Sequence, residues 1–345
     1  MKKNIKTRLI KEFHTLPHNL LLISLSLLLF SCQKKKYPWQ PGISAPRYYP
    51  VAGHVDFGNA GNGSNTSFAN GWGDQYGGVV SGDQLKEVPK QVYIDYYSVV
   101  DGKGFSGEVL LPQEKILDLF REYHINDKNS ADLLVGMAPG GWIRVWFQVS
   151  VGFVNKGGKV IIIEVAKSRL RSYKDETVGV GLKTKDFKTW GNTYTYWQHH
   201  GIPYSAWAEN EKEYDIIFDF YKPNHRKIGF SYISADGTIY QVGREKAHQK
   251  LPVQLEQIAW QGKNREAYNC KVPFPKNFKK YIEQKKLQRL HLQLEIEKDD
   301  EHAIIYLITN NSKEKIVRFK NKTITAEEDK NIDFDYAKEV EYFIQ

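Results

Sequence analysis

The feature that most constrains the fold of this chain is a repeated alternation of apolar and polar residues. The pattern recurs at residues 92–96, 143–149, 214–220, 290–296 and 332–336. Side chains of a strand point alternately to its two faces, so a period of two predicts strands with one buried and one polar face. This is typical of antiparallel sheets covered on one side. The run Val160-Ile-Ile-Ile163 is apolar at every position and predicts a central strand.

Two segments have helical spacing. One opens at Pro112 and would bury Ile116, Leu117 and Phe120; the other opens near Pro275. The Gly- and Asn-rich stretch of residues 58–78 predicts a long loop. We therefore expect a mostly β (α+β) fold with antiparallel, sandwich-like sheets, two flanking helices and a C-terminal β extension.

The N-terminus has the layout of a secretory signal. Five basic residues occupy the first eleven positions, and the apolar run of residues 20–30 follows. This run is too short to cross a hydrocarbon core, which needs roughly 20 residues. It ends in Leu29-Phe-Ser-Cys32, which resembles the lipobox of bacterial lipoproteins. The resemblance implies cleavage after Ser31, acylation of Cys32 and, because Gln33 and not Asp follows, sorting to the outer membrane.

Charge and cysteine content narrow the functional classes. The chain has a formal net charge of +9, of which the first 31 residues contribute four charges. Much of the positive charge therefore belongs to the targeting segment. The high net charge is then no longer an argument for nucleic-acid binding. Cys32 and Cys270 are the two cysteines. If Cys32 is acylated, Cys270 is left without an internal disulfide partner, and we expect it to be a small core residue.

Several segments together resemble the domain-of-unknown-function family 2931 of bacterial lipoproteins, over about Tyr37 to Tyr240. The most specific is Val135-Gly-Met-Ala-Pro-Gly-Gly141 followed by Val145-Trp146. The other segments are Trp39 with Ala45-Pro46 and Tyr49-Pro50, Val88-Pro89 before 92–98, and Leu111-Pro112 before Phe120. The resemblance carries no catalytic residues. It implies an envelope protein, and some similar lipoproteins act as immunity proteins against delivered toxins.

The sequence contains no recognisable catalytic constellation. A serine hydrolase would need a nucleophile on a sharp turn such as G-x-S-x-G, and no segment matches that pattern. His199 and His200 are adjacent, and on a strand they would point to opposite faces and could not easily share a metal ion. The acidic residues between 209 and 219 are typical of a solvated sheet face. We expect no catalytic residues, no metal and no cofactor.

Aromatic residues are the candidates for a binding surface. Trp142, Arg144 and Trp146 share one face of a predicted strand, while Trp72, Trp197, His199 and Trp207 lie in predicted loops. Exposed, either group would suit a sugar, a peptide or a protein partner. If the strand face is covered by another layer, it is instead ordinary core with a snorkelling arginine. The sequence leaves both alternatives open and favours core for the strand face.

The expected organisation has four parts. Residues 1–31 are a lipoprotein signal peptide, 32–50 a lipidated tether, 51–275 a β-rich main domain and 276–345 a helix plus strands. The function expected first is a non-catalytic binding module, anchored in the bacterial envelope and facing the periplasm. Its partner would be an envelope protein or a toxin. The alternative is an envelope hydrolase acting on glycan or lipid.

Overall fold

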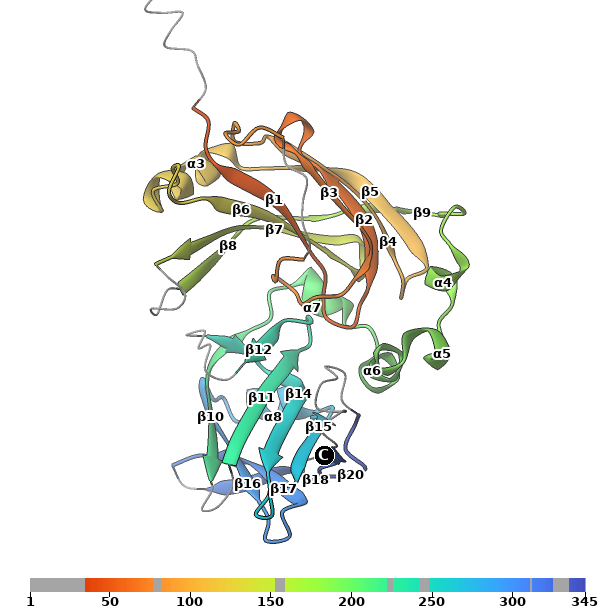
Figure 1. Cartoon of the computed structure of the whole chain (residues 1–345), viewed down its shortest axis with the longest axis vertical. Coiled ribbons are helices and arrows are strands. Elements are labelled where there is room, and N and C mark those ends of the chain that lie inside the picture. The colour runs from red at the N-terminus through yellow and green to blue at the C-terminus, as the bar shows by residue number, and fades with distance from the viewer. Residues whose placement is uncertain are drawn as a thin grey trace, which may run out of the picture.

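The structure is a computed structural model that describes residues 35–76, 82–152, 159–221, 226–241, 248–310, 312–324 and 335–344. These residues form two β-rich lobes stacked along the long axis of the molecule (Figure 1). The first lobe runs from Tyr37 to Ala208 and the second from Glu213 to Ile344. The predicted signal peptide and Cys32 lie outside the described residues.

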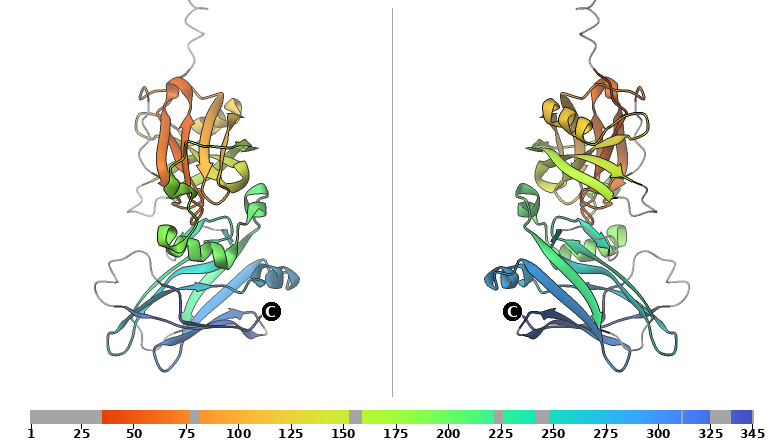
Figure 2. Two further views of the ribbon diagram at one scale, coloured as in Figure 1. Left: turned by 90° about the vertical axis from the view of Figure 1, so that its right-hand side faces the viewer. Right: turned by 90° about the vertical axis from the view of Figure 1, so that its left-hand side faces the viewer.

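The first lobe is a sandwich of two sheets (Figure 2). One sheet has the order β1-β6-β7-β8 and the other β3-β2-β4-β5-β9. Helix α3 packs Ile116 and Phe120 into the core between them. The strands are β1 (Trp39–Ser44), β2 (Val51–Asp56), β3 (Asn62–Phe68), β4 (Gln91–Ser98), β5 (Lys103–Leu110), β6 (Ala131–Ala138), β7 (Trp142–Val151), β8 (Lys159–Arg169) and β9 (Arg171–Tyr173); α3 is Gln113–Glu122, and η1 (Gly58–Ala60) and η2 (Pro139–Gly141) are short 3-10 helices.

The second lobe also has two sheets and its own hydrophobic core. Their orders are β13-β10-β16-β17-β18-β20 and β12-β11-β14-β15-β19. The strands are β10 (Glu213–Tyr221), β11 (Arg226–Ser234), β12 (Ile239–Gln241), β13 (Gln249–Lys250), β14 (Pro252–Gln261), β15 (Ala267–Pro273), β16 (Arg289–Ile296), β17 (His302–Ile308), β18 (Lys313–Lys320), β19 (Thr323–Ile324) and β20 (Glu339–Tyr342), with helix α8 at Phe278–Gln284.

Four short helices follow β9 and lead to the second lobe. They are α4 (Val180–Lys183), α5 (Phe187–Trp190), α6 (Asn192–His200) and α7 (Tyr204–Ala208). Helices α6 and α7 lie where the two lobes meet (Figure 1). No described helix has both the length and the apolar character needed to cross a membrane.

The predicted fold class is confirmed: the fold is mostly β, with antiparallel pairing nearly throughout, and the two predicted helices are α3 and α8. Ile143, Val145, Phe147 and Val149 all point into the core, as their alternation predicts. The two described parallel pairs are β1 with β6 and β10 with β16. The alternation at 332–336 lies largely outside the described residues.

Three local predictions differ from the structure. Val160–Ile163 belongs to β8, which is an edge strand and not a central one. The predicted loop of residues 58–78 contains η1 and strand β3, whose polar sequence shows no apolar alternation. The segment predicted to be the later part of the tether contains strand β1, which pairs in parallel with β6.

The cores also divide the chain differently from the expected domains. The second core begins at Tyr214, within the range expected to be the main domain, and continues to Ile344. Strand β10 pairs along its length with β16, which comes about 70 residues later in the chain. The strands after residue 276 therefore complete a lobe that begins with β10, and do not form a separate extension.

Candidate functional site: the junction of the two lobes

The predicted aromatic residues come together, but inside the molecule. Trp72, Trp146, Trp197 and Trp207 are buried in one cluster between the lobes, and Trp142 packs half-buried against it. The cluster also holds Tyr48, Tyr49 and Tyr196 from the first lobe and Ile233 from the second. An exposed aromatic binding surface built from these residues is therefore wrong for this structure. The alternative, that the strand face is ordinary core, holds.

Close packing inside this junction requires a glycine. The rings of Trp72 and Trp146 meet edge to face, with centroids 5.0 Å apart. A Cβ at Gly136 would lie 2.4 Å from the ring of Trp146 and 2.8 Å from that of Trp72. Both distances are far inside van der Waals contact. Gly136 on β6 is therefore needed for the two indoles to pack against the sheet.

The indole N–H groups of Trp197 and Trp207, two of the buried tryptophans of the junction, are hydrogen-bonded. Trp207 Nε1 donates to the carbonyl oxygen of Asp236, 2.9 Å away in the second lobe. Trp197 Nε1 donates to the carbonyl oxygen of Tyr48 at 2.6 Å. A buried N–H without a partner would cost free energy, so these bonds make the packing of α6 and α7 specific.

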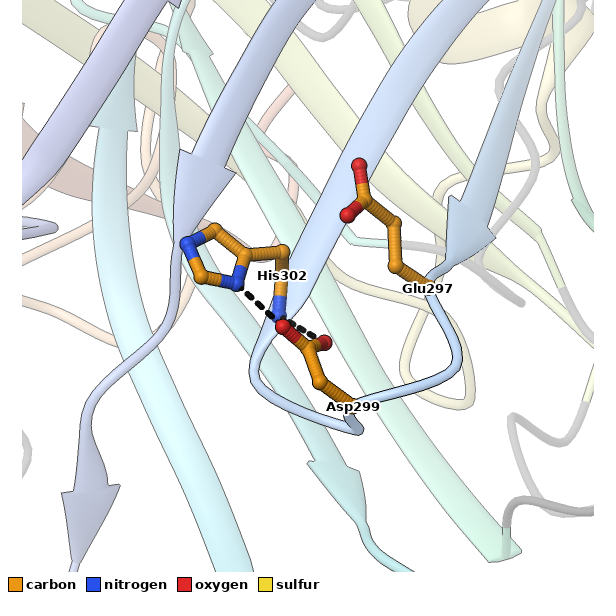
Figure 3. Close-up of side chains that lie close together, drawn as sticks. All are labelled: Glu297, Asp299 and His302. Carbon is orange, nitrogen blue, oxygen red and sulfur yellow. Dashed lines mark hydrogen bonds and ion pairs between the residues drawn. The ribbon is translucent and has the colours of Figure 1, made fainter.

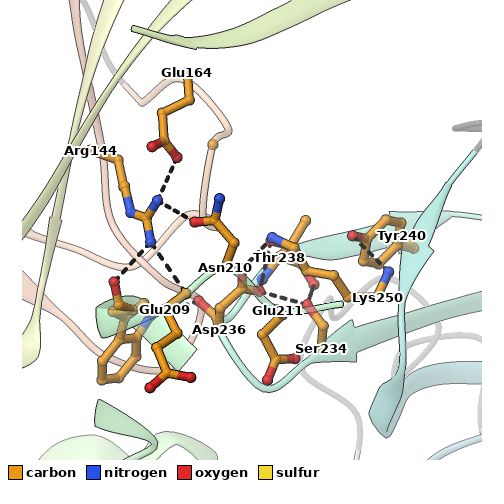
Figure 4. A network of polar contacts seen from close by, with 12 residues as sticks. Arg144, Glu164, Glu209, Asn210, Glu211, Ser234, Asp236, Thr238, Tyr240 and Lys250 are labelled. Carbon is orange, nitrogen blue, oxygen red and sulfur yellow. Dashed lines mark hydrogen bonds and ion pairs between the residues drawn. The ribbon is translucent and has the colours of Figure 1, made fainter. Parts of the chain in front are cut away.

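Arg144 hydrogen-bonds to the segment that connects the two lobes (Figure 4). Its Nη1 donates to Glu164 Oε2 and Asn210 Oδ1, both at 2.5 Å. Its Nη2 donates to the carbonyl oxygens of Trp207 at 3.0 Å and Glu209 at 3.2 Å. The residue is 3% exposed. Arg144 is thus a buried cation neutralised by one carboxylate and by the linker backbone, and it is not available to a ligand.

A second polar network lies on the other side of the junction, at the turn before β12 (Figure 4). The buried carboxylate of Asp236 accepts hydrogen bonds from the hydroxyls of Ser234 and Thr238, and it forms an ion pair with Lys250. Burial alone would raise the pKa of Asp236. The Lys250 ammonium and the two hydroxyls together hold that pKa below its ordinary value. The network fixes the Asp236 carbonyl that receives Trp207.

Tyr48, Glu256, Gln254 and His200 form a further chain of hydrogen bonds at the junction. The Tyr48 hydroxyl donates to Glu256 Oε1 at 2.5 Å, and Gln254 Nε2 donates to Glu256 Oε2 at 3.1 Å. Gln254 Oε1 lies 3.1 Å from His200 Nε2. Burial lowers the pKa of His200 to about 4, so the imidazole is neutral at pH 7. An imidazole and a carboxylate are present, but an amide lies between them.

His199 and His200 lie on helix α6, so the prediction of a strand or loop here is wrong. The ring of His199 is partly exposed and packs 5.2 Å from that of Tyr336. His200 is turned toward Gln254. The two imidazoles therefore have different partners, and neither belongs to the one three-residue group of possible metal ligands found in the described part of the chain.

That group is Glu297, Asp299 and His302, at the turn between β16 and β17 (Figure 3). Arg318 already donates two hydrogen bonds to Glu297, at 2.7 and 2.8 Å, and lowers the pKa of that carboxyl. Asp299 Oδ2 lies 2.5 Å from His302 Nδ1. The three side chains are better described as members of an ion-pair network than as a metal site. Their close spacing in the sequence is a signal that sequence reasoning missed.

The described residues do not assemble the histidine, carboxylate and thiol groups into the site that a hydrolase would need. Four of the described histidines have side-chain polar partners: His200 contacts the Gln254 amide, and His248, His291 and His302 each contact an aspartate, so none of these four pairs with a serine. Of the acidic stretch, Glu211 is paired with Lys279. Cys270 is fully buried, and burial raises the pKa of its thiol, as expected for a core residue. A shallow depression lined by Tyr281, Glu314, Lys315, Phe343 and Ile344 lies apart from the junction.

The first lobe coincides with a known family. The family described as "Protein of unknown function (DUF2931)" matches residues 30–205, which end within α7. Neither a curated protein nor a solved structure matches the chain. The match covers half of the chain and confirms the resemblance seen in the sequence, so the chain belongs to the DUF2931 family, with a second β-rich lobe beyond the matched region.

Proposed function

We propose that the chain is a lipoprotein of the bacterial envelope, anchored through Cys32, that acts as a non-catalytic binding module. The observation that carries the proposal is the spacing between Cys32, which ends the lipobox, and Trp39, which begins the first strand. Six residues separate them, so the two Cα atoms are at most about 25 Å apart when the chain is extended. Such a chain holds the first lobe next to the membrane.

The shape of the molecule supports a role in presentation. Strand β1 begins at the end of the first lobe that is remote from the second lobe (Figure 1). The second lobe is then held away from the bilayer. Gln33 after the cysteine favours the outer membrane, and the protein would face the periplasm. A protein partner, such as an envelope protein or a toxin, fits a module presented in this way.

The closed junction favours binding over catalysis. Glu256 and His200 are junction groups that would suit acid–base chemistry, and Arg144 is a cation that could hold an anion; each is occupied by protein partners. General acid–base catalysis needs such a group within hydrogen-bond reach of a substrate. A ligand would have to bind to outer surfaces of the lobes.

The anchor is tested by metabolic labelling with an alkyne analogue of palmitate, comparing the natural chain with Cys32→Ser. We expect label and membrane association in the natural chain alone. Equal labelling of the two proteins, or membrane retention of Cys32→Ser after a salt wash, would contradict a lipid on Cys32.

The binding role is tested with the chain from Gln33, immobilised without lipid and exposed to envelope and secreted fractions of the host. Retention of one protein, in an amount close to that of the immobilised chain, supports the binding-module proposal. Retention of nothing, together with turnover of a glycan or lipid substrate, would replace it by the hydrolase alternative.

A further inference from the structure

The strand ends around Tyr37 form one rim of the first lobe. The backbone of Tyr37 exchanges two hydrogen bonds with Lys86, which places Leu85 beside the incoming chain. In the sheet, Trp39 pairs with Ala131, and Ala131 pairs with Val149. Val151 lies two residues beyond Val149, so it is level with Tyr37, and it pairs with Lys159. Val160 follows directly.

The second sheet of the lobe reaches the same rim. The segment that begins at Leu85 continues past Trp39, whose Nε1 donates to the carbonyl oxygen of Glu87. It then enters β4, where Gln91 pairs with Leu110 at the end of β5. Leu110 is therefore connected to the tether region through a short, hydrogen-bonded segment.

Four aliphatic side chains on this rim point into solvent. Leu110 is 76% exposed, and Leu85, Val151 and Val160 are each between 42% and 47% exposed. We call these four residues the tether-side rim. Scattered exposed aliphatic residues are normal on a protein surface. Three of these four, however, lie at strand ends, and Leu85 lies next to the Tyr37–Lys86 bridge, on the side of the lobe where the chain arrives from Cys32.

The length of the tether indicates what lies against the tether-side rim. Six residues between Cys32 and Trp39 restrict the start of the lobe to within about 25 Å of the lipid attachment point. A short linker makes the second contact intramolecular, so weak apolar contacts are enough to orient the lobe. We propose that the tether-side rim rests on the bilayer, with its aliphatic side chains at the boundary between headgroups and acyl chains. The proposal rests on the lipid anchor proposed above.

The charge of the rim indicates whether apolar burial or attraction to anionic lipid dominates its contact with the bilayer. Lys36 lies 4.0 Å from Asp83. The rim segments also carry Lys35, Lys86, Lys90 and Lys159 against Glu87 and Glu108, so the excess of positive charge is small. Binding should depend on apolar burial more than on anionic lipid, so it should change little with salt.

The test attaches the lipid chemically, so it does not depend on acylation in the cell. The chain from Cys32 is coupled through that thiol to a maleimide phospholipid in nanodiscs; Cys270 is fully buried and does not compete. Leu110→Trp is compared with Val180→Trp, because Val180 is 80% exposed and lies on α4, away from the rim. Both are measured in nanodiscs with and without brominated lipid, which quenches a nearby indole, and the signal of the natural chain with its eight tryptophans is subtracted. Unchanged thermal melting shows that each variant is folded.

We expect several-fold stronger quenching of the indole at position 110 than of the one at 180, in low and high salt alike. Adding Val151→Asp and Val160→Asp should reduce the quenching at 110. Equal quenching at the two positions would overturn the proposal even if Cys32 is acylated in cells. Quenching at 110 that disappears in high salt would also overturn it, because the contact would then be electrostatic.

Discussion

The two lobes are both two-sheet sandwiches with their own cores, yet they contribute different chemistry to the junction. The first lobe supplies the large aromatic side chains, including Trp197 and Trp207. The second supplies Ile233 and the fixed carbonyl of Asp236. The difference shows that the tryptophans attach one lobe to the other and do not mark a ligand site. The family match ends within the helices that carry this attachment.

The largest expected effect comes from removing the aromatic side of the junction. Trp207→Ala deletes a fully buried indole and leaves the Asp236 carbonyl without its donor. We expect a loss of up to about 5 kcal/mol in the free energy of unfolding. Calorimetry should then resolve two transitions, one for each lobe.

Trp142→Ala is the matched control for Trp207→Ala, because Trp142 is half-buried and packs under the guanidinium of Arg169. It should cost clearly less and leave the lobes coupled. If the two variants behave alike, the junction is not what couples the lobes.

Arg144 provides a polar version of the same test. Arg144→Met keeps most of the volume but leaves Glu164 and two linker carbonyls without their donor. We expect destabilisation of about 3 kcal/mol, measured by denaturant unfolding. In the double variant with Glu164→Gln the loss should be smaller than the sum of the single losses, because the stranded charge is gone. If the losses of the two single variants simply add, Arg144 and Glu164 do not interact energetically.

The sequence predicted the layers better than the junction, for physical reasons. Alternation identified β4, β7, β10 and β16, because each has one face against a core. Strand β3 is polar throughout and gave no such signal. Helices α4 to α7 have four to nine residues each, too short for a helical period to be recognised.

The burial of the tryptophans depends on contacts that a local pattern does not contain. The bond from Trp197 to Tyr48 joins residues 149 positions apart. The sequence favours a core position for Arg144 with a guanidinium that reaches solvent; the residue is in the core, but its guanidinium is buried against linker partners that spacing does not predict. The sequence therefore predicts the residues of the candidate site and favours core for the strand face, but it does not predict that the tryptophans of the expected loops are buried at the junction of the lobes.

Acid should weaken the junction through His200. Burial lowers the pKa of His200 from 6.5 to about 4, so the unfolded chain takes up a proton before the folded protein does. Stability is then lost as the pH falls from about 6.5 to 4, by about 3 kcal/mol, and no further loss comes from this group below pH 4. Unfolding midpoints across this range, compared with His200→Gln, measure the effect. A variant with an unchanged pH slope would contradict it.

The smallest effect is expected at the β16–β17 turn of the second lobe. Glu297→Gln removes a partly exposed ion pair with Arg318, which should cost less than about 1 kcal/mol. Because Arg318 already occupies the carboxylate, EDTA should not change the melting temperature. A drop with EDTA that is absent in Glu297→Gln would instead identify this turn as a metal site.

The most direct test of the account is small-angle X-ray scattering of the chain from Gln33 without its lipid. If the junction holds the lobes as one body, a single arrangement fits the curve, and the fit is the same in low and high salt because the junction is largely apolar. Trp207→Ala should then require a mixture of lobe orientations. A natural chain that already needs such a mixture would contradict the central claim that its aromatic residues lock the two lobes together.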